Sequence, residues 1–421
     1  MTQLISGKDP VSAPTAAAAS SRPRSGLAKR FLSLDDFEIA ARRHLPHPVF
    51  AYISGGAEDN ASLHDNRRAF SDYGFVTRVL RNVSGRSQAV ELFGRRYASP
   101  FGIAPMGISA LSAYRGDIVL ARTAAAANVP MIMSGSSLIR LEDVIAAAPD
   151  TWFQAYLPGE TAKIEALIDR VIRAGVKTLV LTVDTAVLAN RENNVRAGFS
   201  TPLRPSVRLA WQGITHPRWS IGTFLRTFVR HGMPHFENNA ATRGAPILSS
   251  SVARDFGAKD HLDWEHLALI RRRWKGTLVV KGIMHHEDAR KARDTGADGI
   301  IVSNHGGRQL DGTVSPLRVL PEVVAAVGAG FPVMMDSGIR RGTDVLKALA
   351  LGAKFVFVGR PFQYAAAVAG ENGVRHALQI LADEVQRDMG LLGLTSLEEI
   401  GSVHLRASPL AARFPQETRF P

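Results

Sequence analysis

The sequence Gly299-Ile300-Ile301-Val302-Ser303-Asn304-His305-Gly306-Gly307-Arg308-Gln309-Leu310-Asp311-Gly312 is the most informative stretch of the chain. Its first four residues are apolar and predict a short buried strand. The residues after this strand have side chains that a simple turn does not need. His305 can move a proton near neutral pH, and Arg308 can hold a carboxylate with two parallel hydrogen bonds. A base beside a carboxylate clamp at the C-terminal end of a strand indicates chemistry on a small carboxylic acid.

Seven other short apolar runs end in the same way, in polar, Gly or Pro residues. The eight predicted strands are 101–105, 131–134, 152–156, 178–184, 278–282, 299–304, 333–336 and 355–359. Helical patterns lie between them, for example at 116–128, 160–174, 286–295, 321–328 and 343–351. This alternation predicts an α/β fold with a parallel sheet, and eight units predict a (β/α)8 TIM barrel. An open doubly wound sheet is the alternative, but no GxGxxG motif follows the first strand.

Composition narrows the possible functions of this 421-residue chain. It has no cysteine, which excludes disulfides, thiolate nucleophiles and cysteine-ligated metals, and we expect no metal site. The net charge of +13 favours anionic partners, but no nucleic-acid-binding module is present and no nucleic acid is expected to bind. No apolar run is long enough to span a bilayer, so we expect a soluble, cytoplasmic protein.

We divide the chain into a central domain and two tails. Residues 1–30 are rich in Ala, Ser, Pro and Arg and predict a disordered N-terminal tail, with an organelle transit peptide as the alternative. The catalytic domain is expected at 31–393, followed by a C-terminal tail at 394–421.

A long insert separates the fourth and fifth predicted strands, at about residues 195–259. Over residues 196–245 it contains seven arginines and a single acid, Glu237, with aromatic residues between them. Residues 221–231 have apolar residues at helical spacing and arginines at 226 and 230. Such a helix could pack on the barrel or at a subunit contact, or it could bind peripherally to an anionic membrane on the inner face of the cell membrane.

In a TIM barrel the C-terminal ends of the strands form the active site. Each polar residue at these ends could alone be a cap, a turn or a surface residue, but together they indicate one site. In chain order they are Ala104, Pro105, Ser134, Gln154, Tyr156, Thr182, Asp184, Arg191, Lys281, Ser303, His305, Arg308, Asp336, Gly338, Arg340, Gly359 and Arg360.

The last two strand ends predict a phosphate site. Loops after the seventh and eighth strands of many barrels hold a phosphate, and Gly338, Arg340, Gly359 and Arg360 supply backbone donors and cations there. We assign this phosphate to flavin mononucleotide (FMN), since neither a metal cluster nor a dinucleotide motif is present. Lys281 could then stabilise the negative charge that develops on the reduced flavin.

The motifs resemble those of the FMN-dependent α-hydroxy acid oxidase/dehydrogenase family, which includes glycolate oxidase, mandelate dehydrogenase and cytochrome-linked L-lactate dehydrogenase. The resemblance covers residues 31–393 and is most specific in the 303–312 block. The other matching segments are 52–58, 103–105, 153–156, 181–184, 280–282, 336–340 and 359–361.

The resemblance implies a role for each candidate residue. His305 would be the base that takes the hydroxyl or the α proton, and Asp184 would stabilise its protonated form. Tyr52, Arg191 and Arg308 would bind the substrate carboxylate, and Tyr156 the substrate hydroxyl. The remaining residues would bind FMN: Ala104, Pro105, Ser134, Gln154, Thr182, Lys281 and Ser303 along the flavin, Asp336 on the ribityl chain, and Gly338, Arg340, Gly359 and Arg360 at the phosphate.

The resemblance also implies the reaction, the oxidation of an (S)-2-hydroxy acid, with L-lactate as first choice, to the 2-oxo acid. Gly107 stands where oxidases of the family commonly carry Ala, which favours a dehydrogenase that passes electrons to a quinone or cytochrome. The alternatives are an oxidase that releases H₂O₂ and a flavoenzyme acting on a larger substrate such as a peptide. Ser136 replaces a tryptophan of glycolate oxidase and implies a roomier substrate site. Relatives are often homotetramers, and in some the insert associates with the membrane.

Overall fold

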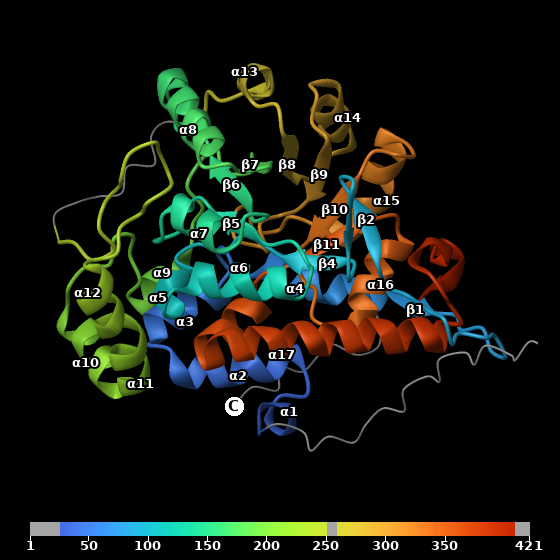
Figure 1. The fold of residues 1–421 in the computed structure, drawn as a ribbon, viewed down its shortest axis with the longest axis horizontal. Coiled ribbons are helices and arrows are strands. Elements are labelled where there is room, and N and C mark those ends of the chain that lie inside the picture. Colours follow the sequence, from blue (N-terminus) through green and yellow to red (C-terminus); the bar gives the residue numbers. More distant parts are fainter. Residues whose placement is uncertain (1–25, 251–258, 409–421) are drawn as a thin grey trace, which may run out of the picture.

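The computed structural model describes residues 26–250 and 259–408, and its centre is a barrel of eight parallel strands (Figure 1). Neighbouring strands pair in the order β4-β11-β10-β9-β8-β7-β6-β5, and a bridge between Ile103 and Met131 joins the two ends of this sheet. The strands are β4 (Phe101–Ile103), β5 (Ile132–Ser134), β6 (Trp152–Tyr156), β7 (Thr178–Thr182), β8 (Thr277–Ile283), β9 (Gly299–Val302), β10 (Val333–Asp336) and β11 (Phe355–Val358). The predicted (β/α)8 TIM barrel is confirmed.

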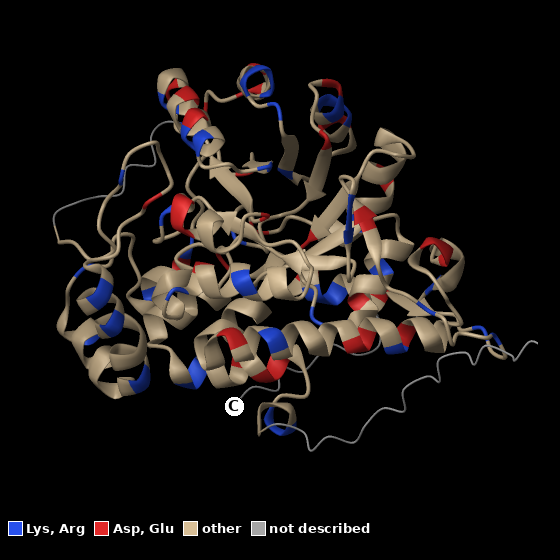
Figure 2. Ribbon diagram, viewed as in Figure 1, with Lys and Arg blue, Asp and Glu red and all other residues tan. Residues whose placement is uncertain are grey.

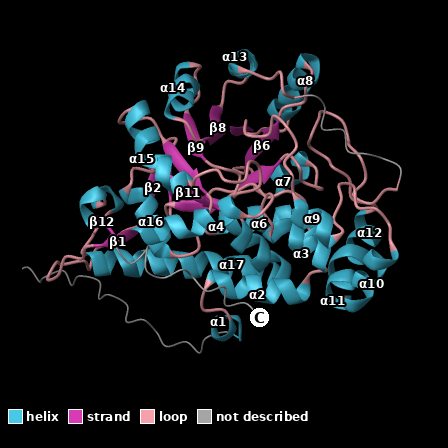
Figure 3. Ribbon diagram, turned by 180° about the vertical axis from the view of Figure 1, so that it is seen from behind, coloured by secondary structure: helices cyan, strands magenta, loops and turns pink. Residues whose placement is uncertain are grey.

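Helices connect successive strands and cover the outside of the barrel (Figure 3). They are α5 (Ser109–Ser112), α6 (Gly116–Ala126), α7 (Leu141–Ala147), α8 (Thr161–Arg173), α13 (Trp264–Arg273), α14 (His286–Asp294), α15 (Pro316–Val327), α16 (Gly342–Ala350) and α17 (Arg360–Leu392). Helix α15 begins at Pro316, before its predicted start at 321. Ser315 caps its N-terminus by accepting a hydrogen bond from Leu317 N, and Pro316 occupies the first helical position.

Aromatic and aliphatic side chains fill the lower part of the barrel. The first inward-facing residues of the strands include Trp152, Val279 and Phe355, which are buried. The hairpin of β2 (Val90–Leu92) and β3 (Arg95–Tyr97) packs against this N-terminal end. Because side chains alternate along a strand, the residues two and four positions further on face the open, C-terminal end of the barrel.

Segments at the two ends of the chain pack on one side of the barrel (Figure 1). The N-terminal elements are α1 (Gly26–Arg30), α2 (Leu34–His44), α3 (His47–Ser54), α4 (Ala61–Arg68), η1 (Ala69–Asp72) and β1 (Tyr73–Phe75). The C-terminal elements are η3 (Leu397–Glu399), η4 (Ser402–His404) and β12 (Leu405–Ala407). Helix α17, kinked at Ala369 and Gly370, packs along α2 and α6.

Elements of regular structure lie within both predicted tails. Helix α1 lies within the predicted tail 1–30, and residues 1–25 are outside the described residues. In the predicted tail 394–421, β12 pairs antiparallel with β1 and Leu394 is buried. A three-residue strand is too short to show a clear polar–apolar alternation, and its partner lies near the other end of the chain, so the local sequence pattern does not reveal it.

The insert after β7 forms its own group of helices at one edge of the molecule (Figure 1). They are α9 (Glu192–Ala197), α10 (Val207–Thr215), α11 (Pro217–Trp219), the π-helical turn η2 (Ser220–Leu225) and α12 (Arg226–His231). Trp219 anchors the group, since its ring is buried and its Nε1 donates to Leu111 O at 2.8 Å. The predicted helix at 221–231 is therefore present, with a π-helical first half. Residues 251–258 of the insert lie outside the described residues.

Candidate active site

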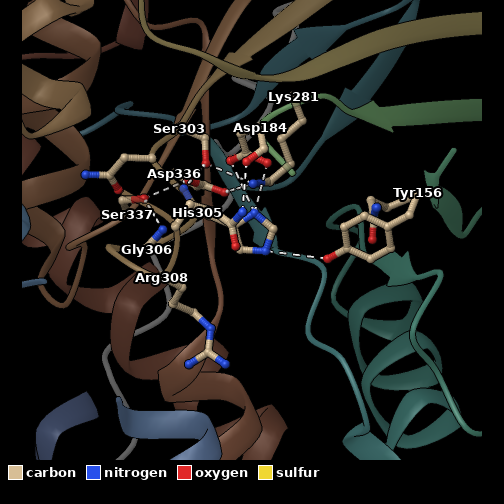
Figure 4. Close-up of polar contacts among 12 residues, drawn as sticks. Tyr156, Asp184, Lys281, Ser303, His305, Gly306, Arg308, Asp336 and Ser337 are labelled. Carbon is tan, nitrogen blue, oxygen red and sulfur yellow. Dashed lines mark hydrogen bonds and ion pairs between the residues drawn. The ribbon is translucent and has the colours of Figure 1, made fainter. Parts of the chain in front are cut away.

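A histidine–carboxylate pair lies at the C-terminal mouth of the barrel (Figure 4). His305 Nδ1 lies 3.0 Å from Asp184 Oδ1 and 3.2 Å from its Oδ2, while Nε2 lies 3.4 Å from the Tyr156 hydroxyl. The strands position all three, since Tyr156 ends β6, Asp184 follows β7 and His305 follows β9. A Cβ at position 282 would lie 2.8 Å from the Asp184 side chain, so the glycine there allows this carboxylate its place. The arrangement leaves Nε2 as the nitrogen that faces the cavity.

Burial and neighbouring charges set the protonation of this pair. Burial lowers the pKa of His305 below its ordinary value of 6.5, and Asp184 opposes that shift only in part. Burial alone would raise the pKa of Asp184, but His305 and Lys281 outweigh it and lower this pKa. The result at pH 7 is a neutral imidazole beside an ionised carboxylate, which is the state of a histidine ready to accept a proton.

A buried lysine, Lys281, lies next to the His305–Asp184 pair. Lys281 Nζ donates to Ser303 Oγ at 2.8 Å and lies 3.0 Å from Asp336 Oδ2. Burial opposes a charge on Lys281, but Asp336 and Asp184 together raise its pKa. Ser303 Oγ also accepts a hydrogen bond from His305 N at 3.0 Å. A buried ammonium group thus lies next to the His305 backbone, held by Asp336 at the C-terminal end of β10 and by Ser303 after β9.

Arginines and a tyrosine form the opposite wall. Arg308 Nη1 donates to Tyr52 O and Gly55 O, both at 2.7 Å, and its guanidinium carbon lies 5.0 Å from the centre of the Tyr52 ring. In the part of the chain that the structure describes, its Nε and Nη2 have no protein acceptor. Burial and Arg191 lower the pKa of Arg308 to about 9, so it remains charged at pH 7. Two charged N–H groups are therefore open to an anion.

One cavity of about 1620 Å³ reaches these groups. It exceeds the roughly 300–1,000 Å³ of a typical ligand pocket, which leaves room for a cofactor and a substrate together. Of the predicted site residues, fifteen line it: Tyr52, Ala104, Pro105, Gln154, Tyr156, Thr182, Arg191, Lys281, His305, Arg308, Asp336, Gly338, Arg340, Gly359 and Arg360. The other three, Ser134, Asp184 and Ser303, hydrogen bond directly to lining residues. All predicted residues are thus brought to one site.

The cavity has features that a flavin mononucleotide fits. The buried amide nitrogen of Gln154 has no acceptor among the described residues, although its oxygen accepts from Ser134 Oγ and Gly135 N, both at 3.3 Å. An aromatic ring system rich in acceptors would satisfy that donor. In the loop after β10, which we predicted to hold phosphate, Gly338 has φ +84°, and a Cβ there would lie 1.9 Å from Asn66 O. Arg340 and Arg360 are both buried beside this backbone, where they supply positive charge.

Three residues that support the site were not among those we predicted. Gln309 donates to Asp184 O at 2.9 Å and accepts from Arg191 Nη2 at 2.6 Å, so it links Asp184 to Arg191. Ser337 Oγ donates to Asp336 Oδ1 at 2.9 Å and accepts from Gly306 N at 3.0 Å. Asn239, from the insert, lines the cavity. The first two lie inside the motifs at 303–312 and 336–340, but no sequence signal placed Asn239 at the site.

Comparisons with known proteins find relatives along most of the chain. The sequence model of the FMN-dependent dehydrogenases matches residues 41–407. An L-lactate dehydrogenase of Stenotrophomonas maltophilia (strain R551-3) is 41% identical, over 87% of this chain and 96% of that protein. An (S)-mandelate dehydrogenase of Pseudomonas putida is 36% identical, over 90% and 95%.

Solved structures lead to the same family. The crystal structure of the monotopic membrane protein (S)-mandelate dehydrogenase superimposes with a TM-score of 0.81 at 35% identity, covering 90% of this chain and 99% of that one. A mandelate oxidase structure has a TM-score of 0.73 at 36% identity, covering 89% and 98%. With the family model matching most of its length, this chain belongs to the FMN-dependent dehydrogenase family and is an FMN-dependent 2-hydroxy acid dehydrogenase.

Proposed function

We propose that this enzyme oxidises an (S)-2-hydroxy acid to the 2-oxo acid, with L-lactate as the first substrate to test. The observation that carries the proposal is the placement of a neutral imidazole nitrogen, His305 Nε2, in the same cavity as the open N–H groups of Arg308. A base and a carboxylate clamp in one cavity suit a molecule whose carboxylate and reacting carbon are adjacent.

In this proposal each residue has a distinct task. The substrate carboxylate binds Arg308, supported by Arg191 and the Tyr52 hydroxyl. Tyr156 hydrogen bonds the substrate hydroxyl, which fits its position 3.4 Å from His305 Nε2. His305 takes a proton from the substrate at Nε2, and Asp184 stabilises the imidazolium that forms. This pairing acts only after the proton has moved, so it favours the transition state over the bound substrate.

FMN, when bound, accepts the two electrons that leave the substrate. Gln154, Ser134, Thr182 and the backbone at Ala104 and Pro105 would line its ring system. Lys281 and Ser303 would face the edge where negative charge develops, Asp336 would bind the ribityl chain, and the loops with Gly338, Arg340, Gly359 and Arg360 would hold the phosphate.

We further propose a quinone or cytochrome as the electron acceptor. The experiment for the whole proposal is an anaerobic absorbance spectrum before and after L-lactate. Bleaching of the flavin band supports it, and lack of bleaching by a series of (S)-2-hydroxy acids that includes L-lactate, (S)-mandelate and (S)-glycerate contradicts it. Admission of air then separates the alternatives, because rapid return of the band with stoichiometric H₂O₂ would indicate an oxidase.

We also propose that the insert binds an anionic membrane surface on the cytoplasmic side. In the part of the chain that the structure describes, no helix is both long and apolar enough to cross a membrane. Helices α10 to α12 contain arginines and no acidic residue (Figure 2), and large apolar side chains are exposed among them. These exposed side chains are Val207, Trp211, Ile214, Ile221, Leu225, Phe228 and Val229. Basic and exposed apolar residues on the same helices suit the lipid headgroup region, and a relative of similar fold is described as a monotopic membrane protein.

Flotation with vesicles tests the membrane proposal. The wild-type protein should float with vesicles containing phosphatidylglycerol and do so less with phosphatidylcholine alone. Replacing Trp211 and Phe228 with serine should reduce flotation by about tenfold or more without loss of flavin, since each exposed ring contributes apolar area to insertion. The matched control replaces Leu391 and Val403, exposed apolar residues outside the insert, and should float like wild type. Equal flotation of all three proteins would contradict the proposal.

Light scattering on the detergent-free protein tests the expected homotetramer.

A further inference from the structure

A single side chain, Gln309, holds both ends of the loop between β7 and α9. Its Nε2 donates to Asp184 O at 2.9 Å, where the loop begins, and its Oε1 accepts from Arg191 Nη2 at 2.6 Å, where the loop ends. Gln309 also lines the cavity that contains His305. One amide group thus joins the two ends of a loop that carries two of the predicted site residues.

The middle of this loop has little support of its own. Within the described parts of the chain, residues 185–189 form no hydrogen bond, and beyond them Asn190 O accepts from Glu58 N at 3.0 Å. Residues 185–189 line the cavity on one side of the loop, while Val187 and Leu188 are 70% and 69% exposed. A segment with few bonds and exposed apolar side chains opens at low cost in free energy. The bonds at its two ends therefore decide where the loop lies.

Two neutral acceptors orient the guanidinium group of Arg191. Its Nε donates to Arg308 O at 3.0 Å, and Gln309 Oε1 accepts one hydrogen of Nη2. Among the residues that the structure describes, none accepts a hydrogen bond from Arg191 Nη1, and this side chain lines the cavity. The bonds to residues 308 and 309 thus leave one charged N–H group of Arg191 for an anion.

The acceptor at position 309 is uncharged, which preserves the positive charge of the site. Arg191 and Arg308 carry like charges, and burial together with Arg191 lowers the pKa of Arg308. A glutamate at position 309 would relieve this repulsion, but it would also cancel part of the charge that attracts a substrate carboxylate. An amide oxygen and a backbone oxygen hold Arg191 close to Arg308 without that loss.

We propose that Gln309 is a positioning residue, which orients Arg191 toward the substrate carboxylate and holds the loop 185–190 closed over the bound substrate. This inference rests on the proposed function, in which Arg191 supports the binding of the carboxylate. Because one amide supplies both the donor and the acceptor, the orientation of Arg191 and the closure of the loop occur together. Loss of Gln309 should therefore weaken binding more than it slows the chemical step.

Ligand binding in a double-mutant cycle tests this role. The probes are pyruvate and phenylglyoxylate, the 2-oxo acids of L-lactate and (S)-mandelate, titrated by the perturbation of the flavin spectrum. Gln309→Met preserves side-chain length but removes donor and acceptor, and it should raise the Kd of the tighter probe about tenfold or more, the value of one hydrogen bond to a charged group. In an Arg191→Met background the same change should alter Kd by less than about twofold, because no guanidinium remains to be oriented.

Thermolysin, which cleaves before large apolar residues, provides a readout that needs no ligand. Cleavage before Val187 or Leu188, identified by mass spectrometry, should be about tenfold faster in Gln309→Met than in wild type at equal FMN content, because the loop opens more often. Gln379→Met is the matched control, since Gln379 bonds Asp383 at 2.7 Å on the exposed face of α17. This control should resemble wild type in both assays.

A shorter amide keeps the test open if Gln309→Met does not fold. Gln309→Asn retains the donor and the acceptor but lacks the length to reach both ends of the loop, so the same two effects are expected. Unchanged Kd and cleavage rate would overturn the inference, as would an equal rise in Kd with and without Arg191. If neither probe perturbs the flavin spectrum and no 2-hydroxy acid bleaches it, the proposed function fails, whereas the cleavage rates still test the hold of Gln309 on the loop.

Discussion

Replacing Asp184 with asparagine isolates the electrostatic part of the proposed mechanism. The substitution preserves the size of the side chain and an acceptor oxygen for His305 Nδ1, but removes the negative charge. Gln309 bonds the backbone oxygen of Asp184 and not its side chain, so this contact should survive. We therefore expect the variant to fold and to bind FMN.

The expected loss follows from the geometry. Opposite unit charges 3.0 Å apart attract by about 5.5 kcal/mol at an effective dielectric constant of about 20. Asparagine retains a neutral hydrogen bond worth about 1 kcal/mol. The slight solvent exposure of both side chains weakens the remaining charge–charge attraction in the wild-type protein. We expect a net loss of about 2–4 kcal/mol in the transition state, or roughly 30- to 1,000-fold in the rate of flavin reduction.

Two further readouts distinguish this role from a structural one. The attraction exists only once His305 is protonated, so kcat should fall while KM changes little. Asp184 raises the pKa of His305 against the effect of burial, so its removal should lower that pKa further. The wild-type kcat/KM should decline on the acid side with a midpoint below 6.5, and in the variant this midpoint should move to lower pH.

Stopped-flow reduction of the flavin between about pH 5 and 8 measures the rate of reduction, its dependence on substrate concentration and the midpoint of the acid limb. Asp169→Asn serves as the control, since Asp169 forms a surface ion pair with Arg273 on the outer helices. A reduction rate close to that of wild type, or an acid limb that moves to higher pH, would refute the assignment of Asp184.

Three further predictions concern the walls of the site. Arg308→Lys should raise KM for the hydroxy acid about tenfold or more with flavin content unchanged, because an ammonium group cannot form the two parallel bonds to a carboxylate; an unaltered KM in steady-state assays would remove Arg308 from the clamp. Gly107→Ala should also raise KM, since its Cβ would lie 2.6 Å from the Tyr52 hydroxyl and displace it, whereas Gly222→Ala, at an open position, should not. In denaturant titrations, Lys281→Met should lower the free energy of unfolding by about 3–5 kcal/mol, because it leaves the buried Asp336 carboxylate unpaired. The double variant Lys281→Met/Asp336→Asn should recover part of this lost stability. A Lys281→Met variant as stable as wild type would contradict this pairing.

The sequence predicted the barrel well because each strand end had its own signal. The alternation that buries Trp152 places Gln154 and Tyr156 at the mouth, and the same period relates Ile301 to Ser303 and His305. Converging strands then bring such residues together without further information. The 303–312 block and the glycines after β10 and β11 could be predicted as part of one site for this reason.

Other features depend on contacts that have no local period. His305 has φ +59°, an uncommon conformation for a residue with a Cβ, and it is held by its hydrogen bonds with Ser303 and Asp184. Asn239 lies at the cavity in a segment that Arg170, from another helix, holds by hydrogen bonds to the backbone oxygens of Glu237 and Ala240. The sequence of the insert therefore indicates a basic, aromatic surface element, and its second role as a wall of the site is visible only in three dimensions.

The central claim is that His305 removes a substrate proton in an FMN-dependent oxidation. The most direct measurement is a single anaerobic turnover, following the flavin band of wild type and His305→Gln at matched FMN content after mixing with L-lactate, or with (S)-mandelate if that is the better substrate. We predict that wild type bleaches and that the variant holds FMN but bleaches about 10³-fold more slowly, the scale of lost general-base catalysis. Bleaching of the variant at the wild-type rate would contradict the claim.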